Sequence, residues 1–155
     1  MPIVNAASAF FNISRIENGE DFELFGPSFT SRAADYMEHC DKERLAVGKA
    51  LGLELYSLLE TVNSQRSEKK ATLYEAFKNN ALYDGLKDPV SLSDRSLSED
   101  LPCGLGSLLD LADMMHVPAP YITAMVDTAS LYMGKPYEPF LTVQDLRAIK
   151  ALRGK

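Results

Sequence analysis

One arginine and three carboxylates lie close together in the segment DRSLSED, residues 94–100, just ahead of an apolar stretch. The guanidinium of Arg95 could hold a substrate carboxylate with two parallel hydrogen bonds, and Asp100 could orient a general acid or base. The same residues also suit a helix start, where Glu99 and Asp100 would complement the helix dipole while Arg95 pairs locally. Spacing alone favours this structural interpretation, and the chemical one stays open.

The string Gly104-Leu105-Gly106 is similar to the beginning of a dinucleotide-binding fingerprint. It lacks the third glycine, and no strand is predicted ahead of it, so a phosphate cradle would have no structural context. We therefore expect a helix with close backbone contacts at this point, and no nucleotide bound by this chain alone.

The remaining polar motifs have structural interpretations. The chain has two histidines and two cysteines without CxxC or HxxxH spacing, so His39, Cys40 and His116 are predicted to be partly buried helix residues and not metal ligands. The charged string DKER at 41–44 is predicted to be a solvated helix face, since charged residues three and four apart are routine on exposed helices. The polar tract SQRSEKK at 64–70 is predicted to be a solvated loop.

The elements that would position these residues are helices. Ser28 or Ser31 is predicted to cap a helix that runs to about Leu51, where Gly52 would end it. Apolar spacings and chain breakers predict further helices over residues 55–62, 73–78, 120–133 and 142–152, with irregular structure over 83–98.

The residues around Asp100 are predicted to open a helix of their own. Ser98 or Glu99 would cap it, and Pro102 would fall in its first turn, where the missing N–H is harmless. Because alternating β-branched and aromatic runs are nearly absent, we expect an all-α domain spanning residues 1–155. Within it, residues 1–27 would be a lead-in segment and residues 28–155 the helical body.

Length and composition describe one ordinary globular domain. The chain has 155 residues, 46% of them hydrophobic and 25% charged, which is enough for a core without disulfides. A net charge of −6 argues against binding nucleic acid. No apolar run reaches about 18 residues, so no membrane span is predicted. With no secretory signal and two cysteines, we expect a reduced, cytoplasmic protein.

Three stretches together resemble the helical C-terminal domain of the octopine/nopaline (opine) dehydrogenase family, whose fold is similar to the C-terminal domain of 6-phosphogluconate dehydrogenase. The resemblance covers nearly the whole chain in the right order. The stretches are NISRIE at 12–17 with DKERLAV at 41–47 and ALGL at 50–53, then TLYEA at 72–76 with NN at 79–80, and then RSLSEDLPCGL at 95–105 with VPAP at 117–120.

The resemblance implies a reaction and a set of site residues. Members of this family join the amine of an amino acid to an α-keto acid and reduce the imine with hydride from NADH or NADPH. A histidine–aspartate pair acts as the acid/base unit, and an arginine binds the keto-acid carboxylate. The arginine maps onto Arg95 and the aspartate onto Asp100. The histidine of the family's N-x-x-x-H-P motif falls on Asn5, and the following proline on Ala6.

The asparagine at this position changes the expected chemistry. An amide can donate a hydrogen bond, but it cannot deliver or accept a proton near pH 7, and losing a positioned acid/base typically lowers a rate by about 10²–10⁴-fold. Two functions therefore stay open: the substrate domain of an oxidoreductase, with Arg95 and Asp100 lining the site, or a non-catalytic module that binds a small carboxylate or assembles with a partner.

The family's cofactor domain has no counterpart in this sequence. NAD or NADP would be held by a Rossmann domain, either an N-terminal portion of a longer native protein or a separate chain. We expect this chain alone to be inactive, and we expect it to expose an apolar face where that domain belongs. Large apolar patches usually bind a partner, so a homodimer of the isolated chain is predicted.

Overall fold

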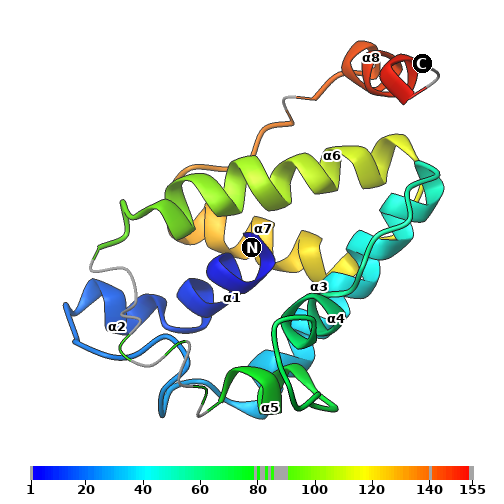
Figure 1. Ribbon diagram of the computed structural model, residues 1–155. Coiled ribbons are helices and arrows are strands. Elements are labelled where there is room, and N and C mark those ends of the chain that lie inside the picture. The colour runs from blue at the N-terminus through cyan, green and yellow to red at the C-terminus, as the bar shows by residue number, and fades with distance from the viewer. Residues whose placement is uncertain are drawn as a thin grey trace.

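The protein consists of helices joined by loops. Its computed structural model describes residues 2–78, 80, 83, 85, 91–139 and 141–153. The predicted all-α class is confirmed (Figure 1). Residues 79, 84 and 86–90, which include parts of the second resembling stretch and of the expected irregular stretch, lie outside the described residues. Within the described ranges, no helix is long and apolar enough to cross a membrane.

The helices follow one another in the order that the sequence predicts, with two additions at the N-terminus, α1 and α2. Their bounds are α1 Pro2–Phe11, α2 Ile13–Glu17, α3 Ser31–Ala50, α4 Leu58–Asn63, α5 Leu73–Phe77, the π-helix η2 Ser96–Gly106, α6 Ser107–Met114, α7 Pro120–Tyr132 and α8 Val143–Arg153. The expected helices at 73–78, 120–133 and 142–152 are confirmed to within two residues at either end. The expected helix at 55–62 begins later, because Ser57 and Glu60 form a capping box ahead of α4.

Helix α1 lies in the middle of the molecule (Figure 1). It runs along η2 and also contacts α3 and α7. Its alanines at positions 6, 7 and 9 are completely buried, because small side chains let neighbouring helices approach closely. Residues 2–11, expected to be part of a lead-in segment, therefore form the helix around which the others pack.

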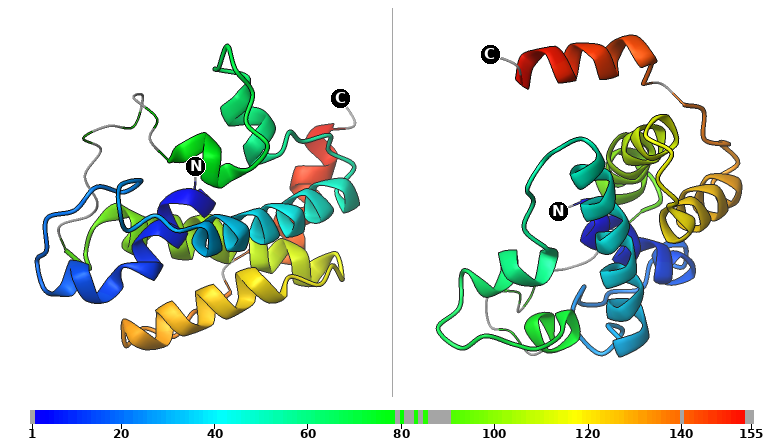
Figure 2. Two further views of the ribbon diagram at one scale, coloured as in Figure 1. Left: turned by 90° about the horizontal axis from the view of Figure 1, so that it is seen from below. Right: turned by 90° about the vertical axis from the view of Figure 1, so that its right-hand side faces the viewer.

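Helix α3 is the longest element and extends across the bundle (Figure 2). Its N-cap is Thr30, which has the extended backbone of a capping residue and accepts a hydrogen bond from the first turn. The sequence predicted Ser28 or Ser31 as the cap, and this prediction is wrong. At the other end Leu51 is the C-cap and Gly52 follows at φ +72°, as predicted, in a conformation that favours glycine.

Two carboxylates in the string 41–44 are buried, so the prediction of a solvated face is wrong for them. Asp41 and Glu43 are 4% and 8% exposed. The two oxygens of Glu43 accept hydrogen bonds from the N–H groups of Tyr121 and Ile122, at 2.8 and 2.9 Å. These N–H groups belong to the first turn of α7 and have no partner inside that helix. A negative charge also stabilises a helix N-terminus.

Helix α3 holds two more helices in the same way. Asp41 accepts a hydrogen bond at 2.7 Å from the first N–H of α4. Glu38 accepts one at 2.8 Å from the first N–H of α5. Three acidic side chains of one helix therefore help to cap three other helices, in addition to Ser57 at α4 and Thr72 at α5.

The helix that carries Asp100 begins two to three residues before the expected cap and has π-helical turns. Pro102 consequently lies inside η2 and not in its first turn. A proline ring clashes with the carbonyl of residue i−4 in an α-helix, and the wider π turn moves that carbonyl away. From Ser107 onward the same rod continues as α6.

Helix α8 stands apart from the rest of the bundle, beyond α6 (Figure 2). The segment that leads to it, of which residues 133–139 and 141–142 are described, is hydrogen-bonded to α6 through Asp110. One oxygen of Asp110 accepts a hydrogen bond from the Tyr137 hydroxyl at 2.8 Å, and the other accepts one from the Leu141 N–H at 2.9 Å. Asp110 therefore helps to position the segment that leads to α8, and Leu146 of α8, which is 7% exposed, also joins the hydrophobic core.

We predict that Glu43→Ala destabilises the protein by about 2–4 kcal/mol, because it leaves two buried N–H groups of α7 without an acceptor. Urea unfolding followed by circular dichroism measures this change. The matched control is Lys42→Ala on the exposed side of the same turn, which should change stability by less than about 0.5 kcal/mol. Equal effects of the two substitutions would contradict the capping role.

Candidate functional site

The three site residues named from the sequence meet between α1 and η2. Asn5 on α1 donates from Nδ2 to Oδ2 of Asp100 on η2, at 2.9 Å. Arg95, the N-cap residue of η2, has Nη2 3.7 Å from Oδ1 of Asp100. Asp100 is 6% exposed, whereas 73% of the Arg95 side chain is exposed. The cluster therefore joins a buried carboxylate, an amide that fixes one of its oxygens, and a guanidinium that lies toward solvent.

The π-helical turn explains how Arg95 and Asp100 reach the same side of η2. In an α-helix, residues five apart are separated by about 140° around the axis. Hydrogen bonds in a π-helix join residues five apart, so such residues lie nearly above one another. The sequence predicted Arg95 in an irregular stretch ahead of the helix, and only the resemblance, not helical geometry, gave a reason to bring the two side chains together. A proline followed by Gly104 and Gly106 was the available signal for a distorted turn.

The ion pairs of Arg95 leave its guanidinium open to a ligand. Its Nε is 3.6 Å from Oε2 of Glu99, and its Nη2 is 3.7 Å from Asp100. Both distances exceed the roughly 2.7–2.9 Å of charge-assisted hydrogen bonds. The local pairing expected from the sequence is therefore present but long. Such a guanidinium retains N–H groups that could form the parallel pair of hydrogen bonds that a carboxylate accepts.

Asn5 determines what the cluster can do chemically. Its amide positions the carboxylate of Asp100 but carries no proton that it could transfer near neutral pH. The two histidines of the chain lie elsewhere: the ring of His39 packs on Tyr121, and His116 follows α6 in a left-handed turn. As built from these side chains, the cluster suits the binding of a carboxylate and an amine better than proton transfer.

Beside the cluster lies a largely apolar hollow of about 450 Å³ that the sequence analysis did not find. It opens between α1, α4 and the η2–α6 rod. Its walls are Pro2, Ile3, Arg44, Tyr56, Leu58, Thr61, Gly104, Leu105, Ser107, Leu108 and Leu111. Because these residues are scattered over five helices and one loop, no local pattern in the sequence could have grouped them.

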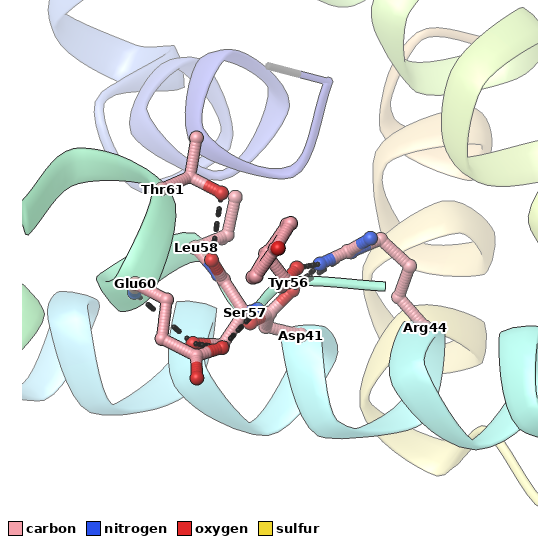
Figure 3. Close-up of polar contacts among 7 residues, drawn as sticks. All are labelled: Asp41, Arg44, Tyr56, Ser57, Leu58, Glu60 and Thr61. Carbon is pink, nitrogen blue, oxygen red and sulfur yellow. Dashed lines mark hydrogen bonds and ion pairs between the residues drawn. The ribbon is translucent and has the colours of Figure 1, made fainter. Parts of the chain in front are cut away.

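One wall of the hollow is held by a polar network around Asp41 (Figure 3). Arg44 donates from Nε to Oδ1 of Asp41 at 2.8 Å and from Nη2 to the carbonyl of Tyr56 at 2.6 Å. The other oxygen of Asp41 accepts the first N–H of α4. The Tyr56 side chain itself is 78% exposed. The network thus fixes the backbone of Tyr56 and leaves its ring at the mouth of the hollow.

The glycines that are similar to a dinucleotide fingerprint serve helix packing, as predicted. A Cβ atom on Gly104 would lie 2.7 Å from Cβ of Pro2, and one on Gly106 would overlap the ring of Tyr137. Both glycines are inside η2, where the backbone is hydrogen-bonded along the helix. The described residues therefore do not fit a pyrophosphate, which needs free backbone N–H groups at a glycine-rich turn.

The candidate metal-ligating residues do not converge. No group of three or more potential ligands occurs in the described part of the chain. Burial raises the pKa of the Cys40 thiol to about 12, and the neighbouring Glu43 adds to the shift. A thiol that stays protonated is a poor metal ligand. Cys103 is exposed on η2, away from Cys40.

Taken together, the fold and the site define an all-helical domain with a carboxylate–amide–guanidinium cluster on one helix pair. Comparison with known proteins names the class. Residues 2–133 match the family described as NAD/NADP octopine/nopaline dehydrogenase, alpha-helical domain. The chain belongs to this family, as the resemblance in the sequence predicted.

Two curated relatives and one solved structure agree with this assignment. An opine dehydrogenase from Arthrobacter sp. (strain 1C) is 31% identical over 128 residues, which cover 83% of this chain and 36% of the relative. A tauropine dehydrogenase from Arabella iricolor is 24% identical over 135 residues, 74% of this chain and 34% of the relative. The chain thus spans about a third of either relative. An octopine dehydrogenase structure with NADH and L-arginine superposes with a TM-score of 0.71 at 20% identity, over 86% of this chain and 38% of that one, and shows the fold.

We predict that Asn5→Asp destabilises the protein in a pH-dependent way. It would place a second carboxylate beside Asp100, and the repulsion raises the folded-state pKa of one of the two above its unfolded value. The repulsion does not lower the free energy of unfolding at low pH, where the carboxyl group is protonated. The free energy of unfolding falls as the pH rises from the unfolded-state pKa through the raised folded-state pKa. Relative to the wild type, the variant should therefore lose about 1–3 kcal/mol at pH 7 and clearly less at pH 4.

Urea unfolding of both proteins at each pH measures the difference. Asn5→Ala is the matched control, since it removes the same hydrogen bond without adding a charge. Its loss of stability should change less between the two pH values than that of Asn5→Asp. If Asn5→Asp behaves like Asn5→Ala at both, the two side chains do not face each other in solution.

Proposed function

We propose that this chain is the substrate-binding helical domain of an NAD(P)-dependent oxidoreductase that condenses an amino acid with an α-keto acid and reduces the product. The observation that carries the proposal is the cluster in which Asn5, Asp100 and Arg95 meet. These are the three positions that the resemblance to opine dehydrogenases points to, and they come from two helices almost a hundred residues apart.

Each residue of the cluster has a role in this proposal. Arg95 binds the keto-acid carboxylate with its exposed guanidinium, which matches a carboxylate in two parallel hydrogen bonds. Asp100 attracts the amine of the amino acid, and Asn5 keeps one carboxylate oxygen of Asp100 in place. Holding two reactants side by side lowers the entropy loss of their condensation.

NAD or NADP belongs to a Rossmann domain that the described residues do not include and whose phosphate site they do not fit. That domain supplies hydride when its cofactor is bound. It would be joined to this chain in one protein, as the lengths of the relatives suggest, or carried by a partner chain. On its own the helical domain is inactive in this proposal, and we place the protein in the cytoplasm.

One observation favours a second function, a non-catalytic module that binds a small carboxylate or assembles with a partner. Asn5 stands where the resemblance places the family's histidine, and its amide is hydrogen-bonded to Asp100. No imidazole is close enough to replace it among the described residues. In this alternative Arg95 is still required, but Asp100 needs only to maintain the packing of α1 on η2.

Pyruvate binding tests the role of Arg95. We expect ¹⁵N-labelled protein to show chemical-shift changes around Arg95 on titration with pyruvate, and Arg95→Gln to weaken binding by about 10–100-fold, the loss of one charged hydrogen-bonded pair. Arg147→Gln on the remote helix α8 is the control and should leave binding unchanged. An Arg95→Gln protein that binds pyruvate like the wild type would contradict both the enzyme and the carboxylate-binding module, and would leave only assembly with a partner.

A fusion separates the two functions. The nucleotide-binding portion of the Arthrobacter relative is joined ahead of this domain, and NADH oxidation is followed with pyruvate and an amino acid. For the enzyme, Asn5→His should raise turnover by about 10²–10⁴-fold, and adding Asp100→Ala should remove the gain. No turnover in either fusion, with pyruvate binding retained, supports the non-catalytic module.

We also propose that the isolated chain forms a homodimer, because it exposes large apolar side chains. Leu131 and Tyr132 at the end of α7 are 68% and 51% exposed. Multi-angle light scattering should give twice the 17.1 kDa of the chain, and Leu131→Ser together with Tyr132→Ser should give the monomer mass. A monomer for the unmodified chain, with no binding of a dye for apolar surfaces, contradicts the proposal.

A further inference from the structure

The apolar hollow lies one helical turn or less from the Asn5–Asp100 pair along α1 and η2, although neither residue of the pair lines it. Helices α1 and η2 run in opposite directions and touch at successive levels: Asn5 meets Asp100, and three residues earlier Pro2 meets Gly104. Three residues of an α-helix rise about 4.5 Å. Pro2 and Gly104 line the hollow. The hollow therefore begins about 4.5 Å along the α1–η2 contact from the Asn5–Asp100 hydrogen bond. Arg95 lies on the other side of Asp100, at the start of η2.

The lining of the hollow contains one cationic side chain, the natural partner for an anion. Most of the lining side chains are aliphatic. The hydroxyl of Thr61 donates to the carbonyl of Ser57 at 2.8 Å, and the hydroxyl of Ser107 donates to the carbonyl of Cys103. Neither is therefore free to donate into the hollow. Among the described residues that line it, Arg44 alone carries a positive charge.

Arg44 is held so that one edge of its guanidinium stays available. Nε and Nη2 are occupied by Asp41 and by the carbonyl of Tyr56 (Figure 3). Nη1 has no hydrogen-bond partner among the described residues, although its two N–H groups are donors. The side chain is 25% exposed. A guanidinium fixed along one edge loses little further freedom when it binds a ligand along another.

We propose that this hollow binds the amino-acid substrate, with Arg44 holding its carboxylate. The inference rests on the proposed function and extends it to the second substrate. The amine is directed along the α1–η2 contact toward Asp100, and the side chain lies against Ile3, Leu58 and Leu108. Because these walls are aliphatic, the amino acid is one with an apolar side chain, such as leucine.

The proposal gives the site two carboxylate anchors, one on each side of Asp100. Arg95 holds the keto acid and Arg44 the amino acid, so that the amine and the keto carbon meet near the buried carboxylate. The condensation product has two carboxylates joined through one nitrogen. Arg44 is thus a substrate-binding residue that also supports the local fold through Asp41.

Two ligands that differ in a single group test the proposal on the unmodified protein. L-leucine and L-leucinamide share the amine and the side chain, but leucinamide has no carboxylate. In titrations followed by amide chemical shifts, L-leucine should perturb residues around the hollow. L-leucinamide should bind at least about tenfold more weakly, as expected when one charged hydrogen-bonding partner is removed. This comparison needs no substitution and so does not depend on whether a variant folds.

Variants then assign the effect to Arg44. Arg44→Gln should weaken L-leucine binding at least about tenfold and leave pyruvate binding within about twofold. Arg44→Lys should give partial binding, because the charge is kept and the fork geometry is lost. Lys42→Gln is the matched control, since it removes the same charge two residues away on an exposed face. Urea unfolding of each variant shows whether it folds.

The outcomes separate failure of this inference from failure of the proposed function. Equal binding of L-leucine and L-leucinamide, or no L-leucine binding at concentrations on the order of 50 mM, overturns the role of the hollow. Pyruvate binding that ignores Arg95→Gln overturns the proposed function instead. The inference is supported if the wild type binds L-leucine more tightly than L-leucinamide and Arg44→Gln loses L-leucine binding. This holds whether or not pyruvate binding depends on Arg95.

Discussion

The fold depends on acidic side chains of one helix that occupy the N-termini of three others. Glu38, Asp41 and Glu43 of α3 accept hydrogen bonds from backbone N–H groups at the starts of α5, α4 and α7. These N–H groups have no acceptor within α5, α4 or α7. A buried carboxylate is unfavourable unless it is paired or hydrogen-bonded, and an uncapped helix end is unfavourable for the same reason. The carboxylates accept the hydrogen bonds that the helix ends need to donate. The position of α3 therefore sets the directions in which α4, α5 and α7 leave the bundle.

The candidate site depends indirectly on these contacts of α3. Helix α1 is held between η2, α3 and α7, and its alanines allow the close approach that brings Asn5 to Asp100. On the other wall of the hollow, Asp41 serves two functions, since one oxygen starts α4 and the other fixes Arg44. A change in how α3 meets α4 would therefore alter the shape of the hollow without touching the Asn5–Asp100 pair.

Much of this architecture could be predicted from the sequence, because helix periodicity and breakers are local signals. The glycine stop at Gly52 and the helices after Thr72 and Ala119 follow from such signals. Burial of Asp41 and Glu43 could not, because in sequence a buried cap and a solvated ion pair look alike. The π turn that aligns Arg95 with Asp100 has no established pattern, and the hollow joins residues more than a hundred positions apart. The role of Arg44 could therefore be argued only once the helices were in place.

The asparagine at the centre of the cluster also determines how the protein responds to acidity. An imidazole beside Asp100 would gain or lose charge as the surroundings cross neutrality, and ligand affinity would follow it. An amide has no such transition, so in the proposed function the affinity of Arg95 and Asp100 for a ligand would not change through a histidine in the cluster. Ligand binding would therefore lack the step near neutral pH that a titrating imidazole produces.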